Sequence, residues 1–331
     1  MTATDALTLD DLATPSLILD RSRLEANAAI MSKRLADMGV RLRPHLKTAK
    51  SADVARIATA GHFGGITVST LAEAKYFAQN GILDMVYAVA LAPQKLAFVS
   101  VLQATYGARI TVLVDSLDAA RGITDLAPSM PDELPVLIEI DCGGGRAGVT
   151  LNDPNLIAIA KILHTAKNVS FEGVLTHAGQ SYHCHSVAEI VAVSETERDT
   201  VVAAARMLEA AGVPCPVISG GSTPTAVHAA NFDGMTEMRP GVYVFSDLMQ
   251  SALGWGDHDT IAVTVLATVI GHRRDLGQIL IDAGGLALSK DRGMDHIDAS
   301  VGMGLVFDKL GRQAIAGLYV DDTHQEHGIL R

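Results

Sequence analysis

Short runs of β-branched and apolar residues alternate with amphipathic helical patterns along most of this 331-residue chain. Such alternation indicates parallel strands joined by helical crossovers, because two consecutive parallel strands need a long connection. The pattern predicts strands at residues 16–19, 40–43, 65–68, 85–90, 110–114, 136–140, 173–176, 217–219 and 242–245. These are one too many for an eight-stranded barrel, so one of them is expected to belong to another part of the protein.

The helical patterns between these runs have clear ends. One apolar face recurs at steps of three and four residues through Leu24, Ala28, Met31, Leu35 and Met38. Gly39 follows it, in the position where a left-handed residue commonly ends a helix. Thr70 and Glu73 have the spacing of a capping box at the start of another helix, which Gly81 is expected to end.

The pattern changes after about residue 246. Strands are expected at 261–270, 278–281 and 316–319, with few helices between them. The predicted fold is therefore α/β: a (β/α)8 TIM barrel over residues 21–245, and a β-rich second domain formed by residues 1–20 and 246–331. The first strand is expected to join this second domain. A doubly wound sheet is the competing fold, but no Gly-x-Gly-x-x-Gly turn follows the first strand.

The overall composition excludes several classes of protein. Hydrophobic residues make up 48% and charged residues 19% of the chain, which is typical of a globular protein. The net charge of −11 argues against a nucleic-acid partner. The N-terminus does not resemble a secretory signal, the longest apolar run is too short to span a bilayer, and three cysteines are too few for a disulfide framework. We expect a cytoplasmic protein that acts on a small molecule and has no membrane partner.

Lys47 follows the predicted strand 40–43 within the segment Arg43-Pro44-His45-Leu46-Lys47. Lysine amines form imines with carbonyl compounds, pyridoxal phosphate (PLP) included. An ordinary surface lysine is the alternative, and this segment alone does not decide between the two.

Polar residues also cluster where other barrel strands are expected to end. They include Ser69, Thr70, Arg146, Thr176, His177, the segment 220–223 and the segment 239–247. In a (β/α)8 barrel, the active site is built from the carboxyl ends of the strands. The convergence of several such ends on polar and glycine-rich sequence therefore indicates an enzyme.

Three segments have both a functional and a plain interpretation. Residues 219–225 have the glycines and hydroxyls of a phosphate cradle, although an ordinary turn fits them too. Gly143-Gly144-Gly145-Arg146 is either a flexible loop or a means of placing a guanidinium against a cofactor ring or a substrate carboxylate. His183-Cys184-His185 has the composition of a metal site, but two nearby ligands do not make one.

Six motifs stand in the same order as in a known family. They are Arg43-Pro44-His45-x-Lys47-Thr48, Glu139-Ile140-Asp141 with Gly145-Arg146-x-Gly148-Val149, Thr176-His177-Ala178-Gly179, Gly220-Gly221-Ser222-Thr223-Pro224-Thr225, Gly241-Val242-Tyr243-Val244-Phe245-x-Asp247 and Glu326-His327-Gly328. With them the chain resembles the fold-type III PLP enzymes, in the group of D-threonine aldolases and D-serine dehydratases, whose N-terminal domain is like that of alanine racemase. Within this group it is most similar to the dehydratases of D-threo-3-hydroxyaspartate. The resemblance extends from about Thr14 to Gly328.

The resemblance implies a PLP cofactor and a set of site residues. Lys47 would form the internal aldimine and remove the α-proton of the substrate, and Arg239 would lie against the pyridine nitrogen. The implied catalytic residues are Lys47, His45, His177 and Tyr182. The implied cofactor-binding residues are Lys47, Arg146, His177, Tyr182, Gly220, Gly221, Ser222, Thr223, Arg239, Gly241, Val242 and Tyr243, of which Gly221, Ser222, Thr223, Gly241 and Val242 would hold the phosphate. The family works as homodimers.

The resemblance further implies a lyase that eliminates water from a D-3-hydroxy amino acid, such as D-threo-3-hydroxyaspartate or D-serine, to give a keto acid and ammonia. Retro-aldol cleavage to glycine and an aldehyde is the alternative. Ser181 precedes Tyr182 where the aldolases carry a histidine, which favours elimination. A non-enzymatic PLP carrier is a further alternative, but such carriers lack the second domain. A racemase would need a second catalytic base, and the sequence shows no evident candidate for one.

Enzymes of this group bind a divalent metal (Zn, Mn or Mg) through a His-x-Cys or His-x-Asp pair that lies beyond the Glu-His-Gly segment. The sequence ends at Arg331, before such a pair. We therefore expect either a longer natural chain or an absent or rebuilt metal site, and we assign no metal ligand.

Overall fold

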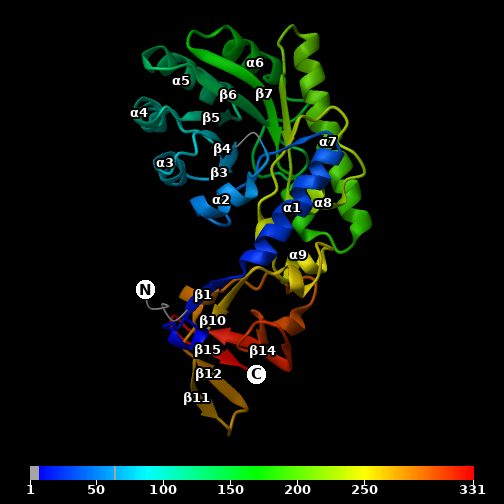
Figure 1. Ribbon diagram of the computed structural model, residues 1–331. Helices are drawn as coiled ribbons and strands as arrows, with labels where there is room; N and C mark the ends of the chain where they lie inside the picture. Colours follow the sequence, from blue (N-terminus) through cyan, green and yellow to red (C-terminus); the bar gives the residue numbers. More distant parts are fainter. Residues whose placement is uncertain (1–6, 63–64) are drawn as a thin grey trace. The chain divides into compact units, whose positions relative to one another are not determined.

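The computed structural model describes residues 7–62 and 65–331. The chain divides into two compact units, one of residues 25–244 and one of residues 1–24 and 245–331 (Figure 1). Each unit has an apolar cluster of its own. One is formed by Val86, Leu113, Leu137 and Leu175 in the first unit, and another by Ile281, Ala283, Val320 and Leu330 in the second.

The first unit contains a sheet of eight parallel strands in the order β2-β9-β8-β7-β6-β5-β4-β3. The strands are β2 (Arg41–Leu42), β3 (Ile66–Val68), β4 (Asp84–Ala90), β5 (Arg109–Val114), β6 (Leu134–Ile140), β7 (Val169–Thr176), β8 (Val217–Gly220) and β9 (Glu237–Met238). Just beyond β2, His45 pairs in parallel with Thr67 of β3, so the two edges of the sheet meet. The Leu46 N–H donates to the Thr67 carbonyl at 2.9 Å across this junction. The expected (β/α)8 barrel is confirmed.

Helix α1 (Arg21–Asp37) precedes the first barrel strand, and an α-helix follows each strand from β2 to β8. These helices are α2 (Ala52–Ala58), α3 (Leu71–Gln79), α4 (Leu96–Tyr106), α5 (Leu117–Leu126), α6 (Leu156–Thr165), α7 (Val187–Ala210) and α8 (Thr223–His228). Helices α3 to α6 lie along the outer side of their strands (Figure 1). The expected helix ends are present: Gly39 and Gly81 have φ of 72° and 79°, and the Thr70 hydroxyl accepts the Glu73 N–H at 3.0 Å. No helix in residues 7–62 and 65–331 is long and apolar enough to cross a membrane.

The second unit is rich in antiparallel strands, as expected. Strand β1 (Ser16–Leu19) pairs with β10 (Val263–Leu266), so the surplus first strand does join this unit. The larger sheet has five strands in the order β11 (Val269–Arg273), β12 (Gln278–Ile281), β15 (Gly328–Leu330), β14 (Ala314–Thr323) and β13 (Leu305–Phe307). Two short helices, α9 (Leu248–Ala252) and α10 (Gly285–Leu288), belong to the same unit.

Two strand predictions are wrong in detail. Residues 242–245 are not a strand, since Val242–Val244 forms the 3-10 helix η5, and the eighth barrel strand is β9. The segment is apolar because Tyr243 and Val244 are buried, and burial alone does not distinguish a strand from a helical turn. The run 261–270 is two strands that belong to different sheets, because β10 pairs with β1 whereas β11 pairs with β12.

Gly173 allows strand β7 to lie against β8. Its φ is +133°, and a Cβ at this position would lie 2.1 Å from the Val217 carbonyl oxygen. Gly39 also has a positive φ of +72°, but a Cβ there would meet no atom within 4 Å. Gly173 is therefore required both by the close contact and by its backbone conformation, whereas Gly39 is required by its backbone conformation alone.

We predict that Gly173→Ala lowers the free energy of unfolding by at least about 3 kcal/mol, because it forces the two strands apart in addition to straining the backbone. Gly39→Ala should cost only about 1–2 kcal/mol, the usual cost of a left-handed alanine. Urea denaturation followed by circular dichroism measures both. Equal losses in the two variants would contradict a close contact between β7 and β8.

Candidate active site

The predicted site residues lie beyond the carboxyl ends of the barrel strands. His45 and Lys47 follow β2, Arg146 follows β6, and His177 and Tyr182 follow β7. Gly220 ends β8 and Gly221, Ser222 and Thr223 follow it, and Arg239, Gly241, Val242 and Tyr243 follow β9. Because the strands are parallel, all of these positions share one rim of the barrel. Hydrogen bonds between the loops show which of them come together.

His177 joins the loops after β7 and β8. Its ring Nδ1 lies 2.9 Å from the Gly221 carbonyl oxygen. A carbonyl can only accept, so Nδ1 carries the hydrogen and Nε2 carries the lone pair. Burial lowers the pKa of His177 to about 4, which leaves the ring neutral at physiological pH.

Hydroxyl groups line the turn between β8 and α8. Ser222 caps α8 by accepting the Thr225 N–H at 3.2 Å, and its hydroxyl bonds that of Ser181 at 2.8 Å. The Thr223 N–H donates to the Tyr182 hydroxyl at 3.3 Å, and the Thr223 hydroxyl accepts the Tyr243 N–H at 3.2 Å. The loops after β7, β8 and β9 therefore meet at this turn.

Two glycines permit the loops to approach this closely. A Cβ on Gly221 would lie 2.6 Å from the backbone nitrogen of Arg239, and a Cβ on Gly241 would lie 2.8 Å from the His45 carbonyl oxygen. Gly221 has a φ of +125° as well, which side chains rarely adopt. Glycine is thus needed where β8 meets β9 and where β9 meets β2.

Lys47 and His45 share the loop after β2. Lys47 is exposed at the rim, and desolvation of its amine, followed by the charge of Arg146, lowers its pKa. Burial, followed by the charges of Lys47 and Arg239, holds the pKa of His45 well below its ordinary value. A larger fraction of the Lys47 amine is therefore uncharged, as a nucleophile or base requires.

The rim is cationic. The side chain of Arg146 is 65% exposed, its guanidinium lies 3.9 Å from the Glu139 carboxylate, and its charge lowers the pKa of both Lys47 and His177. Arg239 also lowers the pKa of His177 in this way. A rim with these cations is suited to an anionic ligand.

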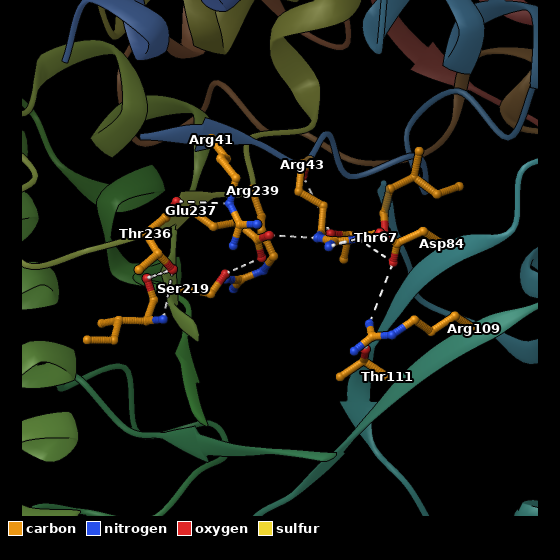
Figure 2. Close-up of polar contacts among 12 residues, drawn as sticks. Arg41, Arg43, Thr67, Asp84, Arg109, Thr111, Ser219, Thr236, Glu237 and Arg239 are labelled. Carbon is orange, nitrogen blue, oxygen red and sulfur yellow. Dashed lines mark hydrogen bonds and ion pairs between the residues drawn. The ribbon is translucent and has the colours of Figure 1, made fainter. Parts of the chain in front are cut away.

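A chain of hydrogen-bonded, buried polar groups holds the guanidinium of Arg239 (Figure 2). Only 4% of Arg239 is exposed, and its guanidinium donates to the Ser219 hydroxyl at 2.5 Å and to the Thr176 carbonyl at 2.6 Å. Ser219 in turn donates to Glu237 Oε1 at 2.8 Å. Burial lowers the pKa of Arg239 to about 10, against the opposing effect of the Glu237 charge.

The same chain continues through the barrel interior (Figure 2). Glu237, which is 1% exposed, accepts from Arg43 Nε at 2.8 Å through its second oxygen. Arg43 also donates to Asp84 at 3.1 Å, and Arg109 lies 3.9 Å from Asp84. Burial acts to lower the pKa of Arg43, but the carboxylates of Glu237 and Asp84 outweigh it and raise the pKa.

The sequence did not reveal two of the buried glutamates of this region, Glu237 and Glu197. Glu197 lies on α7, and its Oε1 accepts the N–H groups of Ala178 and Gly221, each at 2.9 Å. The Gly221 N–H is therefore directed to a protein carboxylate. A signal for Glu197 was available, because it interrupts an apolar face that includes Ile190, Val201, Ala204, Ala205 and Leu208. No comparable signal marks Glu237.

Comparison with known proteins agrees with this architecture. Residues 19–248 match the family described as alanine racemase, N-terminal domain. The chain belongs to this family. Residues 262–331 match a second family, described as a putative serine dehydratase domain. The pair of domains is that of the fold-type III PLP enzymes.

Three relatives from this family are particularly similar. The chain is 44% identical to D-threo-3-hydroxyaspartate dehydratase from Delftia sp. over 98% of its own length and 84% of the relative's. The structure of that enzyme matches with a TM-score of 0.94 and covers 98% of this chain and 85% of the other. D-serine dehydratase from Dictyostelium discoideum is 31% identical, with coverage of 93% and 82%. D-threonine aldolase from Filomicrobium marinum is 27% identical, with a TM-score of 0.81 and coverage of 97% and 82%.

The described residues contain no cluster of metal-binding side chains. One solved cysteine-to-alanine variant of a D-threo-3-hydroxyaspartate dehydratase is named as the metal-free form. In the present family member, no group of three or more His, Cys, Asp or Glu side chains among residues 7–62 and 65–331 could hold a metal ion. The segment 183–185 forms no strand: His183 ends the 3-10 helix η4 (Gly179–His183), His183 and His185 are exposed, and Cys184 is buried.

The segments 282–285 and 324–328 of the second unit pack against each other. A Cβ on Gly284 would lie 2.4 Å from the backbone nitrogen of His327, and the Gly285 N–H donates to the His324 carbonyl at 2.7 Å. Asp282 accepts from the Thr14 hydroxyl at 2.5 Å. These contacts give the segments 282–285 and 324–328 a structural role in this unit.

We predict that Glu237→Ala lowers the free energy of unfolding by about 3–5 kcal/mol, because it leaves the guanidiniums of Arg43 and Arg239 buried without their shared carboxylate. Asp84→Ala removes a partner of the same Arg43, but the Asp84 side chain is 34% exposed, so about 1 kcal/mol or less is expected. Urea denaturation compares the two variants. A larger loss in Asp84→Ala would show that Glu237 is not the central member of the chain.

Proposed function

We propose that this protein is a PLP-dependent lyase that eliminates water from D-3-hydroxy amino acids, with D-threo-3-hydroxyaspartate and D-serine as the first candidate substrates. One observation carries the proposal. A lysine amine of lowered pKa shares the rim with a hydroxyl-lined turn, in a chain 44% identical to a dehydratase of this type over 98% of its length. The products would be a keto acid and ammonia.

The residues at the rim fit PLP. Lys47 would hold the carbonyl carbon of the cofactor, and Ser222, Thr223, Gly241 and Val242 would bind its phosphate among the cationic groups described above. Arg239, held by Ser219 and Thr176, would lie against the pyridine nitrogen. When bound, PLP supplies an electron sink for the charge that develops at the substrate Cα.

The protein's own groups would carry the protons. Lys47, freed when the amino group of the substrate takes its place, would remove the proton from the substrate Cα, since its lowered pKa favours the neutral amine. The bond from Cβ to the hydroxyl oxygen breaks, and the proton held on Lys47 Nζ can leave with that oxygen as water. The resulting enamine hydrolyses to the keto acid and ammonia. Neutral His177 presents an Nε2 lone pair that can accept a hydrogen bond from the substrate.

Retro-aldol cleavage is the second candidate, because D-threonine aldolases are also relatives. That reaction needs a base for the substrate hydroxyl proton. Ser181 is buried and its hydroxyl donates to the Ala178 carbonyl at 2.8 Å, so it does not supply such a base. This observation favours elimination. A PLP carrier without activity is a third, weaker alternative, and the β-rich unit argues against it. The homodimer and the cytoplasmic location stay predictions.

We predict that borohydride reduction of the purified holoenzyme fixes PLP covalently on Lys47, because reduction converts an imine into a stable secondary amine. Mass spectrometry of the digested protein locates the label. Lys47→Ala should lose this label, whereas Lys50→Ala, which changes an exposed lysine of the same segment, should keep it. A label on another lysine in the wild-type protein would contradict the assignment.

A product assay tests the reaction itself. The wild-type enzyme, incubated separately with D-threo-3-hydroxyaspartate, D-serine and D-threonine, should release ammonia and keto acid without glycine. Ammonia and glycine are quantified in the same sample, and L-serine serves as the control substrate. Glycine with an aldehyde would identify an aldolase. Neither product, with PLP bound, would support the carrier.

A further inference from the structure

Glu197 is a buried carboxylate to which the proposed reaction gives no part. It is 1% exposed and projects from α7, whereas the site residues come from the loops at the strand ends. Within residues 7–62 and 65–331, Glu197 forms no ion pair within 4 Å. One of its oxygens accepts two peptide N–H groups, those of Ala178 and Gly221, both at 2.9 Å.

These two peptide groups surround His177. Ala178 directly follows His177 in the chain, and Gly221 supplies the carbonyl that accepts from the His177 ring at 2.9 Å. One carboxylate oxygen therefore holds both the backbone that carries the ring and the residue that the ring contacts. Gly221 also precedes Ser222, so the same bond fixes the start of the hydroxyl-lined turn.

Burying the carboxylate of Glu197 on this helix face costs free energy, because a charged group loses its contact with water. Burial raises the pKa of Glu197, while its bonds from the peptide N–H group of Gly221, from Thr225 and from the N–H group of Ala178, together with the charge of Arg239, act to lower it. An apolar side chain would pack on this face, as Val201 and Leu208 do, without that cost. The carboxylate adds acceptors for two N–H groups that would otherwise be buried without partners.

We propose that Glu197 is a positioning residue of this active site, which holds His177 in its Nδ1–H tautomer and fixes the turn before Ser222 by binding the N–H groups of Ala178 and Gly221. The proposal rests on the proposed function, since it assumes that this rim binds PLP and substrate. Glu197 itself touches neither. It acts through His177 Nε2, which keeps its lone pair only while Nδ1–H is held by the Gly221 carbonyl.

The direct test is nitrogen NMR of the holoenzyme labelled with 15N in its histidine rings. The His177 signals are assigned by their loss in His177→Asn. In the wild type, Nδ1 should be protonated and Nε2 bare between about pH 5 and pH 8. Glu197→Gln should preserve this pattern, because an amide oxygen can accept both N–H groups. Glu197→Ala should give averaged signals from both tautomers, and the midpoint of ring protonation should rise above the value of about 4.

A second readout is the affinity of the hydroxyl-lined turn for the cofactor phosphate. The ratio of the affinities for PLP and for pyridoxal, which lacks the phosphate, is measured by titration of the cofactor-stripped enzyme. We expect this ratio to fall by about 10-fold or more in Glu197→Ala, and by less than about 3-fold in Glu197→Gln. Glu195→Ala, an exposed acid on the same helix, is the matched control and should leave both readouts unchanged.

Glu197→Asp decides the question if Glu197→Ala does not fold, because it keeps the charge but withdraws the oxygen from the two N–H groups. It should shift the His177 signals as alanine would. Unchanged His177 signals and an unchanged affinity ratio in folded Glu197→Ala or Glu197→Asp would overturn the proposal, as would equal loss in Glu197→Gln and Glu197→Ala. Failure of the wild-type enzyme to carry PLP on Lys47 would instead overturn the proposed function.

Discussion

The shared carboxylate of Glu237 is the interaction on which the barrel interior depends. Two guanidiniums, those of Arg43 and Arg239, are buried in one barrel and are held by Glu237, directly in one case and through Ser219 in the other. Charges removed from water are tolerated only when their partners are well placed. Since Arg239 also bonds the Thr176 carbonyl of β7, the chain of groups that satisfies these charges sets the position of three neighbouring strand ends.

Burial also determines the chemistry of the rim. Desolvation lowers the pKa values of Lys47, His45 and His177 and so favours the neutral forms of these three side chains. The guanidiniums of Arg146 and Arg239 strengthen this effect through their charge. The result is a local site that attracts anions in a protein whose net charge is −11. Overall charge therefore says little about such a site.

Local patterns predicted most of the fold. The helix ends at Gly39 and Gly81 and the cap at Thr70 depend on neighbouring residues, and they were predicted correctly. The strand expected at 242–245 was wrong because its apolar residues report burial, whereas the true strand β9 has two residues and too little sequence for any period. The Lys47 segment and the hydroxyls at 222 and 223 were found by their place after strands, and their roles stay proposals.

The sequence by itself determined the order of strands and helices, the ends of several helices and the family resemblance, because these depend on residues close in the chain or on motifs in a fixed order. Only the tertiary structure decided that Glu237 binds Arg43, 194 residues away, and that Glu197 reaches the loops after β7 and β8 from the outer helix α7. Both carboxylates are recognisable only from what surrounds them. Closure of the barrel buries side chains that are distant in the sequence, and each buried charge or N–H group requires a partner.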